Sequence, residues 1–248
     1  MTGWLVMQAV DLRAGTHRNF LPRWLWLVAA PSLLPLLYLV RWLDLDFYLR
    51  WIEGERGLIE NLGPLFLLPA IFCGFALWRL RRVLPSAWIA LWFLLHGAGA
   101  LYFAGEEISW GQHFFDWETP QTISALNDQN ETNLHNMSSW LDQKPRIALW
   151  VWAVTGGFFT PLLIAMGIVP MRGPESWRYW VLPPAACMPA GLLVGCVRLP
   201  EYLSFYMGMT PPFPFDIRAS ELQELFIAQF LCFYLVSVYR RARLAPDM

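Results

Sequence analysis

The sequence predicts an all-α membrane protein, a six-transmembrane-helix bundle with a long extracytoplasmic loop between the third and fourth helices. Of the 248 residues, 56% are hydrophobic and only 15% are charged, whereas a soluble domain carries roughly 25% charged residues. Six apolar runs are long enough to cross a bilayer, and none alternates as a half-buried strand would. Lysine and arginine (18 together) are balanced by aspartate and glutamate (19 together), so the composition argues against a nucleic-acid partner.

The six predicted spans share a length of about 17–25 residues and few charges. They are about 24–40, 58–78, 87–105, 147–171, 179–197 and 222–239. The second span carries Glu60 near its start, and the third carries His96 near its middle. Pro183, Pro184 and Pro189 fall in the fifth span, which we expect to be bent or broken because proline lacks a backbone donor. The chain is interpreted as one polytopic domain, residues 1–248.

Basic residues indicate the orientation of the spans. Eleven of the 18 lysines and arginines fall at the two termini or in the even-numbered loops, whereas 16 of the 19 acids fall at the opposite ends of the spans. Because Lys and Arg are retained on the cytoplasmic side, we expect cytoplasmic N- and C-termini and extracytoplasmic odd-numbered loops. Charges interrupt the first 20 residues, which therefore do not resemble a cleaved signal peptide. This pattern predicts a multi-pass membrane protein with both termini in the cytoplasm.

The densest polar motif is G-E-E-I-S-W-G-Q-H, residues 105–113, at the outer end of the third span. If the helix continues, Glu106, Ser109, Trp110 and His113 share one face. Two adjacent carboxylates, Glu106 and Glu107, are costly to bury at a membrane surface unless they are paired, protonated or bound to a cation. The alternative is that the helix has already left the membrane there and that both acids are solvated.

A second polar motif, N-D-Q-N-E-T-N-L-H-N, spans residues 127–136. Glu131 and His135 are four residues apart, so on a helix they could chelate one metal ion. Asn133 lies between them as a further polar candidate. The alternative is a capping box formed by Asp128 and Glu131, which leaves His135 an ordinary histidine.

A third polar motif, S-E-L-Q-E, leads into the sixth span at residues 220–224. A capping box of Ser220 and Gln223 accounts for Glu221, but Glu224 lies deeper and is followed by an apolar run. If the outer ends of the helices converge, six carboxylates and two histidines meet in one polar site: Glu60, Glu106, Glu107, Glu131, Glu221, Glu224, His113 and His135.

Several blocks of the sequence resemble a recurring pattern in uncharacterised bacterial polytopic membrane proteins. The blocks are G-E-E-I-S-W-G-Q (105–112), W-E-T-P (117–120), N-D-Q-N-E-T-N-L-H-N (127–136), G-L-I-E-N (57–61) and S-E-L-Q-E (220–224). The resemblance covers about a third of the chain and implies a polytopic fold, but no particular reaction.

The leading hypothesis is a metal-assisted hydrolase or transferase that acts on a lipid or lipid-linked substrate at the extracytoplasmic interface. Glu107, Glu131, His135 and Glu224 are the predicted metal ligands, for Zn, Mn, Fe or Ca. Glu106 or His113 is the predicted general base.

Two alternatives come from other classes. The first is a cation or proton pathway that uses Glu60, His96 and Glu224 as relay groups. The second is a non-catalytic subunit of an envelope assembly, whose long outer loop docks a protein partner. Besides the predicted ligands and bases, the further polar-site candidates are Glu60, His96, Glu221 and Asn133.

Overall fold

The chain is a multi-pass helical membrane protein. The structure is a computed structural model that describes residues 21–53, 57–115, 117–124, 132–133 and 139–244. These residues contain no strand. Six helical segments are long and apolar enough to cross a membrane, which confirms the predicted fold class. They are Leu25–Leu43, Leu58–Arg79, Ala87–Glu107, Lys144–Ala165, Trp177–Tyr206 and Ala219–Leu244.

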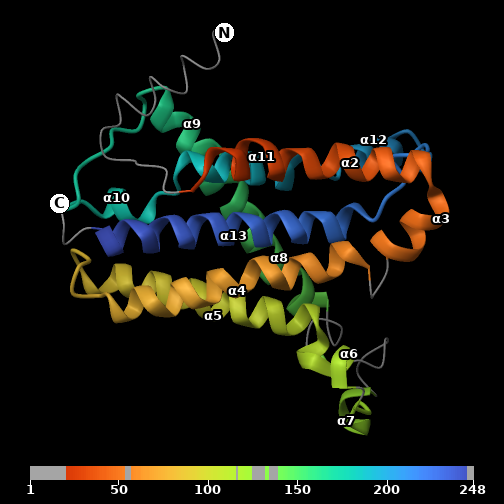
Figure 1. The fold of residues 1–248 in the computed structure, drawn as a ribbon, viewed down its shortest axis with the longest axis horizontal. Helices are drawn as coiled ribbons and strands as arrows, with labels where there is room; N and C mark the ends of the chain where they lie inside the picture. Colours follow the sequence, from red (N-terminus) through yellow and green to blue (C-terminus); the bar gives the residue numbers. More distant parts are fainter. Residues whose placement is uncertain (1–20, 54–56, 116, 125–131, 134–138, 245–248) are drawn as a thin grey trace.

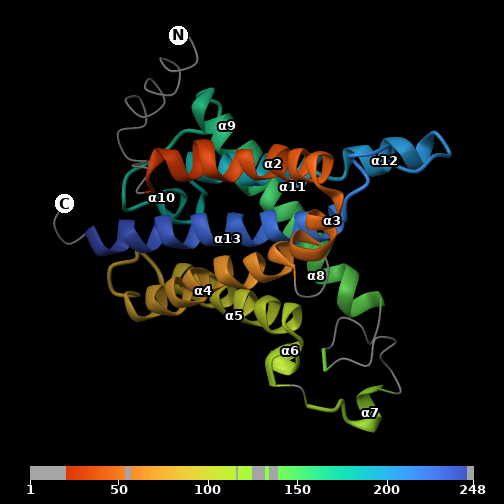
Figure 2. The ribbon, with the colours of Figure 1, turned by 45° about the vertical axis from the view of Figure 1, so that its right-hand side comes forward.

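The sixth span, α13 (Ala219–Leu244), lies at the centre of the bundle (Figures 1 and 2). On one side it packs against α4 (Leu58–Arg79), which pairs with α5 (Ala87–Glu107). On the other side it packs against α11 (Met188–Cys196), next to α2 (Ala30–Leu43). Most α13 side chains are therefore buried by protein, and those of α2 and α4 are more exposed.

Close helix crossings depend on glycine. A β-carbon at Gly74 of α4 would lie 2.5 Å from the Gly97 Cα of α5. In the second crossing, a β-carbon at Gly191 of α11 would lie 2.6 Å from the Ala153 carbonyl oxygen. Small residues let membrane helices approach until their backbones touch, which gains dispersion energy where lipid offers no hydrophobic driving force.

The fourth span is built from three consecutive helices. They are α8 (Ser139–Trp152), the π-helix η5 (Ala153–Phe159) and α9 (Thr160–Ala165). The predicted end of this span at residue 171 is too late. Gly167 adopts φ +75° directly after α9, and a left-handed glycine is a common helix terminator.

The fifth span is interrupted, as its prolines predict. α10 (Trp177–Val181) ends at Leu182, and the helix resumes as η6 (Ala185–Cys187) and α11. The Tyr234 hydroxyl of α13 donates to the Val181 carbonyl oxygen over 2.7 Å. A backbone acceptor freed by the interruption is thereby satisfied inside the protein, as lipid surroundings require.

Two predicted spans were too short because charged residues were taken as span ends. The first continues to Leu43 past Arg41, and the fifth continues to Tyr206 as α12 (Leu199–Tyr206). Arg41 binds Asp216 through two hydrogen bonds of 3.0 and 2.8 Å. An arginine whose charge is paired costs far less to place at a helix end near the membrane surface.

The two ends of the bundle differ in charge. At the acidic end lie the start of α4 with Glu60, the end of α5 with Glu107 and the start of α13 with Glu221. At the basic end lie the end of α4 with Arg79 and the end of α13 with Arg243. The short helices α6 (Gln112–Phe115) and α7 (Gln121–Ser124) project from the acidic end (Figure 1).

Candidate functional site

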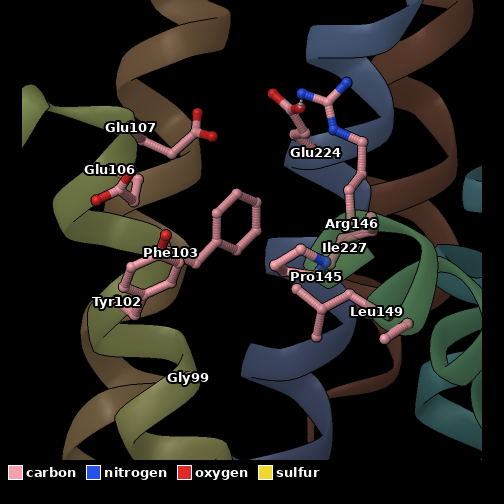
Figure 3. A pocket seen from close by; sticks show the side chains of 11 residues that line it. Gly99, Tyr102, Phe103, Glu106, Glu107, Pro145, Arg146, Leu149, Glu224 and Ile227 are labelled. Carbon is pink, nitrogen blue, oxygen red and sulfur yellow. Dashed lines mark ion pairs between the residues drawn. The ribbon is translucent and has the colours of Figure 1, made fainter. Parts of the chain in front are cut away.

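A cavity of about 330 Å³ lies at the acidic end, between α5, α8 and α13 (Figure 3). Apolar groups form most of its wall. The lining residues are Gly99, Tyr102, Phe103, Glu106, Glu107, Pro145, Arg146, Ala148, Leu149, Glu224 and Ile227. The size and the apolar lining with a few polar groups are typical of a small-molecule site.

Charged side chains from three helices meet at one end of this cavity. Arg146 of α8 forms an ion pair with Glu224 of α13. Glu107 of α5 points across the cavity toward this pair (Figure 3). Glu60 and Glu221 lie near enough to repel the Glu107 carboxylate, as Glu224 does, and Arg146 attracts it. Three carboxylates and one guanidinium thus act on Glu107, although Glu221 is also paired with Arg218 outside the cavity.

Glu106 points away from that pair and is part of a turn. α5 ends at Glu107, and Ser109, Trp110 and Gly111 all have left-handed backbones, with φ of 45°, 55° and 104°. The Trp110 Nε1 donates to the Glu106 carboxylate over 2.6 Å. The Trp110 ring lies over Gly105, where a β-carbon would come within 2.8 Å of it. Two left-handed non-glycine residues are strained, and this hydrogen bond and ring contact stabilise them.

The same turn anchors the described part of the following loop. Asn133 is 2% exposed and donates from Nδ2 to the Ser109 hydroxyl over 3.1 Å. The Gln112 side chain accepts from the Thr132 backbone N–H over 2.6 Å and donates to the Thr119 hydroxyl over 3.0 Å. In G-E-E-I-S-W-G-Q, the residues around Glu107 therefore build a turn, and Glu107 faces the cavity.

The condition for Glu106, Ser109, Trp110 and His113 to share one helical face is not met, because α5 does not continue past Glu107. The physical reason is the left-handed turn, which ends α5 before Ser109 and begins α6 in a new direction. His113 lies in α6, apart from α5.

His96 lies in an aromatic cluster, deeper in the bundle than Glu107. Its Nδ1 lies 2.8 Å from the Trp92 carbonyl oxygen, and its ring centroid lies 6.1 Å from Trp152 and 5.7 Å from Tyr234. The Trp92 Nε1 donates to the Tyr234 hydroxyl over 3.0 Å. The contacts of His96 are thus a backbone carbonyl and aromatic rings, which is the bonding typical of a structural histidine.

Of the four predicted metal ligands, Glu107 and Glu224 line the cavity, and Glu131 and His135 lie outside the described residues. Within the described part of the chain, no three His, Cys, Asp or Glu side chains are grouped closely enough to hold a metal ion.

Arg146 is a site residue that the sequence reasoning missed, because it was counted only as a loop charge. The feature of the sequence that could have revealed Arg146 is its position. It stands directly before the apolar run of the fourth span, where a charged side chain is unusual.

A second ionic cluster lies at the acidic end, between α2, the η2 helix (Tyr48–Ile52) and the start of α13. Arg41 holds the pKa of Asp216 below its ordinary value through their hydrogen bond. Burial raises the pKa of Glu53, which lies 3.9 Å from Arg41 and 3.5 Å from Arg218. Burial likewise raises the pKa of the fully buried Tyr48. This cluster ties together segments that are distant in sequence.

Comparison of the chain with protein-family models, with curated proteins and with solved structures gives no match. The function proposed below therefore depends on the cavity and its charges.

Proposed function

We propose that this membrane protein binds a lipid or lipid-linked substrate in the cavity between α5, α8 and α13. One observation carries the proposal: a single cavity has apolar walls along its length and charged side chains at one end. An acyl or prenyl chain fits against Phe103, Leu149 and Ile227. The headgroup then lies beside Glu107 and Arg146. Amphiphiles match this distribution of apolar and polar lining.

The charges favour a headgroup with an amine or several hydroxyl groups. Carboxylates outnumber guanidinium groups around Glu107, so the site attracts hydrogen-bond donors and positive charge. Glu224 already binds Arg146, which leaves Glu107 to accept a proton from a bound hydroxyl or amine. We therefore infer that Glu107 is the general base of a hydrolysis or transfer reaction. Glu106 is a positioning residue, because Trp110 occupies its carboxylate.

A divalent metal is a separate part of this proposal. If a metal is bound, Glu107 and Glu224 would supply two carboxylate ligands, and Glu131 with His135 would complete the set; Glu107 would then be a ligand in place of the general base. Elemental analysis of protein purified without chelator tests it. A stoichiometric metal that is lost in Glu107→Gln supports a metal-assisted reaction. If the purified protein contains no metal and still retains its lipid, the metal-assisted reaction is contradicted. The carboxylates would then bind the headgroup without a metal.

The arginine-rich basic end supports cytoplasmic termini in a bacterial inner membrane. The cavity then opens near the extracytoplasmic surface. Cysteine labelling at Glu118 and at Arg172, with a reagent that does not cross membranes, tests this orientation: we expect labelling at Glu118→Cys only.

The lipid proposal is tested by mass spectrometry of lipids that co-purify with the protein. Gly99→Leu adds a side chain at a position where a β-carbon meets no atom within 4 Å, so it narrows the cavity without a clash. We expect it to lose most bound lipid. We expect Glu107→Gln to lose about ten-fold in lipid affinity, because a charge-assisted hydrogen bond is lost.

Each variant has a matched control. Ala98→Leu places a leucine at the neighbouring, exposed position that does not line the cavity, and Glu118→Gln neutralises an exposed loop carboxylate. Both controls should retain lipid as the wild type does. Equal lipid retention in Gly99→Leu and Ala98→Leu would overturn the proposal.

The two alternative functions give different outcomes. Proton or cation flux in proteoliposomes that depends on His96 would favour the relay pathway of Glu60, His96 and Glu224. Stable co-purification of one envelope protein, together with normal function of Glu107→Gln, would favour a scaffold.

A further inference from the structure

A second pocket lies at the basic end, between the last turns of α4 and α13, and is separate from the site proposed above. It encloses about 620 Å³. It is lined by two arginines, Arg79 of α4 and Arg243 of α13. The remaining lining is apolar or aromatic, and includes Phe72, Phe75 and Tyr239.

The charge of this pocket is positive and uncompensated by the described protein. Neither Arg79 nor Arg243 forms an ion pair with a described residue. Among the described residues, Glu175 is the one carboxylate at the basic end, and it does not line the pocket. The neighbouring Arg241, by contrast, is fully buried and donates to the Tyr179 carbonyl oxygen. Two arginines from different helices thus present donors in one place that are not paired with a carboxylate of the described residues.

The apolar part of the pocket faces the membrane. Phe72 is 63% exposed and Phe75 is 39% exposed. The Phe72 and Tyr239 rings meet edge to face, with centroids 5.8 Å apart, so they join α4 to α13. Trp78 lies one residue before Arg79, in the position of an interfacial tryptophan at the end of a span.

We propose that this pocket binds an anionic phospholipid, with its phosphate between Arg79 and Arg243 and its acyl chains over Phe72, Phe75 and Tyr239. Charge complementarity identifies the occupant. Paired arginines at the end of two membrane helices match a headgroup phosphate, and the aromatic surface below them matches the chains. The bound lipid then bridges α4 and α13 at the basic end.

The test is a lipid titration of the purified full-length protein, followed by native mass spectrometry. Dioleoyl phosphatidylglycerol and dioleoyl phosphatidylcholine have the same chains, so their ratio of Kd values isolates the headgroup. Each arginine near a phosphate contributes about five-fold in affinity. We expect the wild type to bind phosphatidylglycerol more tightly than phosphatidylcholine. The ratio of the two Kd values should change about five-fold toward equality in Arg79→Gln and in Arg243→Gln, and about 25-fold in the double variant.

Three controls keep the result interpretable. Arg172→Gln removes an exposed arginine at the same end that does not line the pocket and should keep the wild-type preference. The double variant Arg79→Lys with Arg243→Lys should keep most of it, since the charge is retained. Thermal unfolding of each variant shows whether it is folded.

Two results would overturn the proposal. One is a wild-type protein without preference for phosphatidylglycerol. The other is a folded Arg79→Gln/Arg243→Gln variant that keeps the preference. Glycerol 3-phosphate, which lacks acyl chains, should not compete with the lipid at equal concentration. Equal competition would contradict a lipid and indicate a site for free phosphate esters.

Discussion

Glu106 and Glu107 are neighbours in the chain, yet their carboxylates point in opposite directions from the end of α5 (Figure 3). The Glu106 carboxylate accepts a hydrogen bond from Trp110, whereas the Glu107 carboxylate faces the Arg146–Glu224 ion pair. Helical geometry separates adjacent side chains by about 100°, so Glu106 stabilises the turn while Glu107 points across the cavity.

Trp110→Phe should destabilise the protein. The ring keeps its place over Gly105, but the hydrogen bond to Glu106, which is 3% exposed, is lost. Removing a donor from a buried carboxylate costs about 1–3 kcal/mol. The midpoint of thermal unfolding in detergent should fall. Trp117→Phe removes a comparable hydrogen bond from an exposed tryptophan and should change the midpoint much less; equal effects would contradict a special role for the Glu106 contact.

Gly74→Ala should separate α4 from α5. The added β-carbon would lie 2.5 Å from the Gly97 Cα, and overpacking of this kind costs about 1–3 kcal/mol. Gly63→Ala, on the same helix, meets no atom within 4 Å. It should be neutral or stabilising by up to about 1 kcal/mol, because alanine is the better helix former. The midpoints of thermal unfolding of the two variants test this difference. If both variants are destabilised, the stability depends on glycine at either position and not on the close crossing of α4 and α5.

Asp216→Asn should change how stability depends on pH. The hydrogen bond from Arg41 lowers the pKa of Asp216, so the pair stabilises the folded state above the ordinary pKa of about 3.8. That stability is lost as the pH falls through the lowered, folded-state pKa. We therefore expect the variant to unfold at a lower temperature than the wild type at pH 7, and the difference to shrink below about pH 4.

The control for this pH dependence is Asp46→Asn, which alters an exposed carboxylate in the first turn of α3 (Leu45–Phe47). Its unfolding midpoint should stay close to that of the wild type from pH 3 to 7. A constant gap between wild type and Asp216→Asn over this range would show that the Arg41 pair does not contribute through ionisation.

Tyr234→Phe should weaken the packing around the break in the fifth span. The hydroxyl donates to the Val181 carbonyl oxygen and accepts from Trp92, and Tyr234 is fully buried. Loss of two hydrogen bonds within a membrane protein costs about 1–2 kcal/mol. Tyr206→Phe, at a tyrosine that is 85% exposed, is the matched control in the same thermal assay and should have no effect.

The existence of six spans was predictable because each is a long apolar run with few charges. Backbone polar groups must be hydrogen-bonded inside the bilayer, so runs without strand-like alternation form helices. Their ends were less predictable. Arg41 and the Arg198–Glu201 pair made two spans look shorter than they are. The partner of Arg41 lies 175 residues away, and no local pattern shows that its charge is neutralised.

The candidate site was predictable in part. Motif reasoning selected Glu107 and Glu224, which line one cavity from two helices. It did not distinguish Glu106 from Glu107, because that difference depends on the left-handed turn at Ser109, Trp110 and Gly111. Left-handed serine and tryptophan are unusual, and contacts of Trp110 within the turn and of Ser109 with Asn133 favour them. The contribution of Glu131 and His135 stays a prediction.

The central position of α13 has a consequence for biogenesis. The ribosome makes this segment after the other five spans, yet α4 and α11 both pack on it. It carries Gln223, Gln229, Ser237 and Arg241 in buried positions, and such side chains are poorly accommodated by hydrocarbon alone. Nascent chains that stop before Ala219 would leave two half-assembled groups of helices in the bilayer. Assembly of the two groups of helices must therefore wait until α13 has been made.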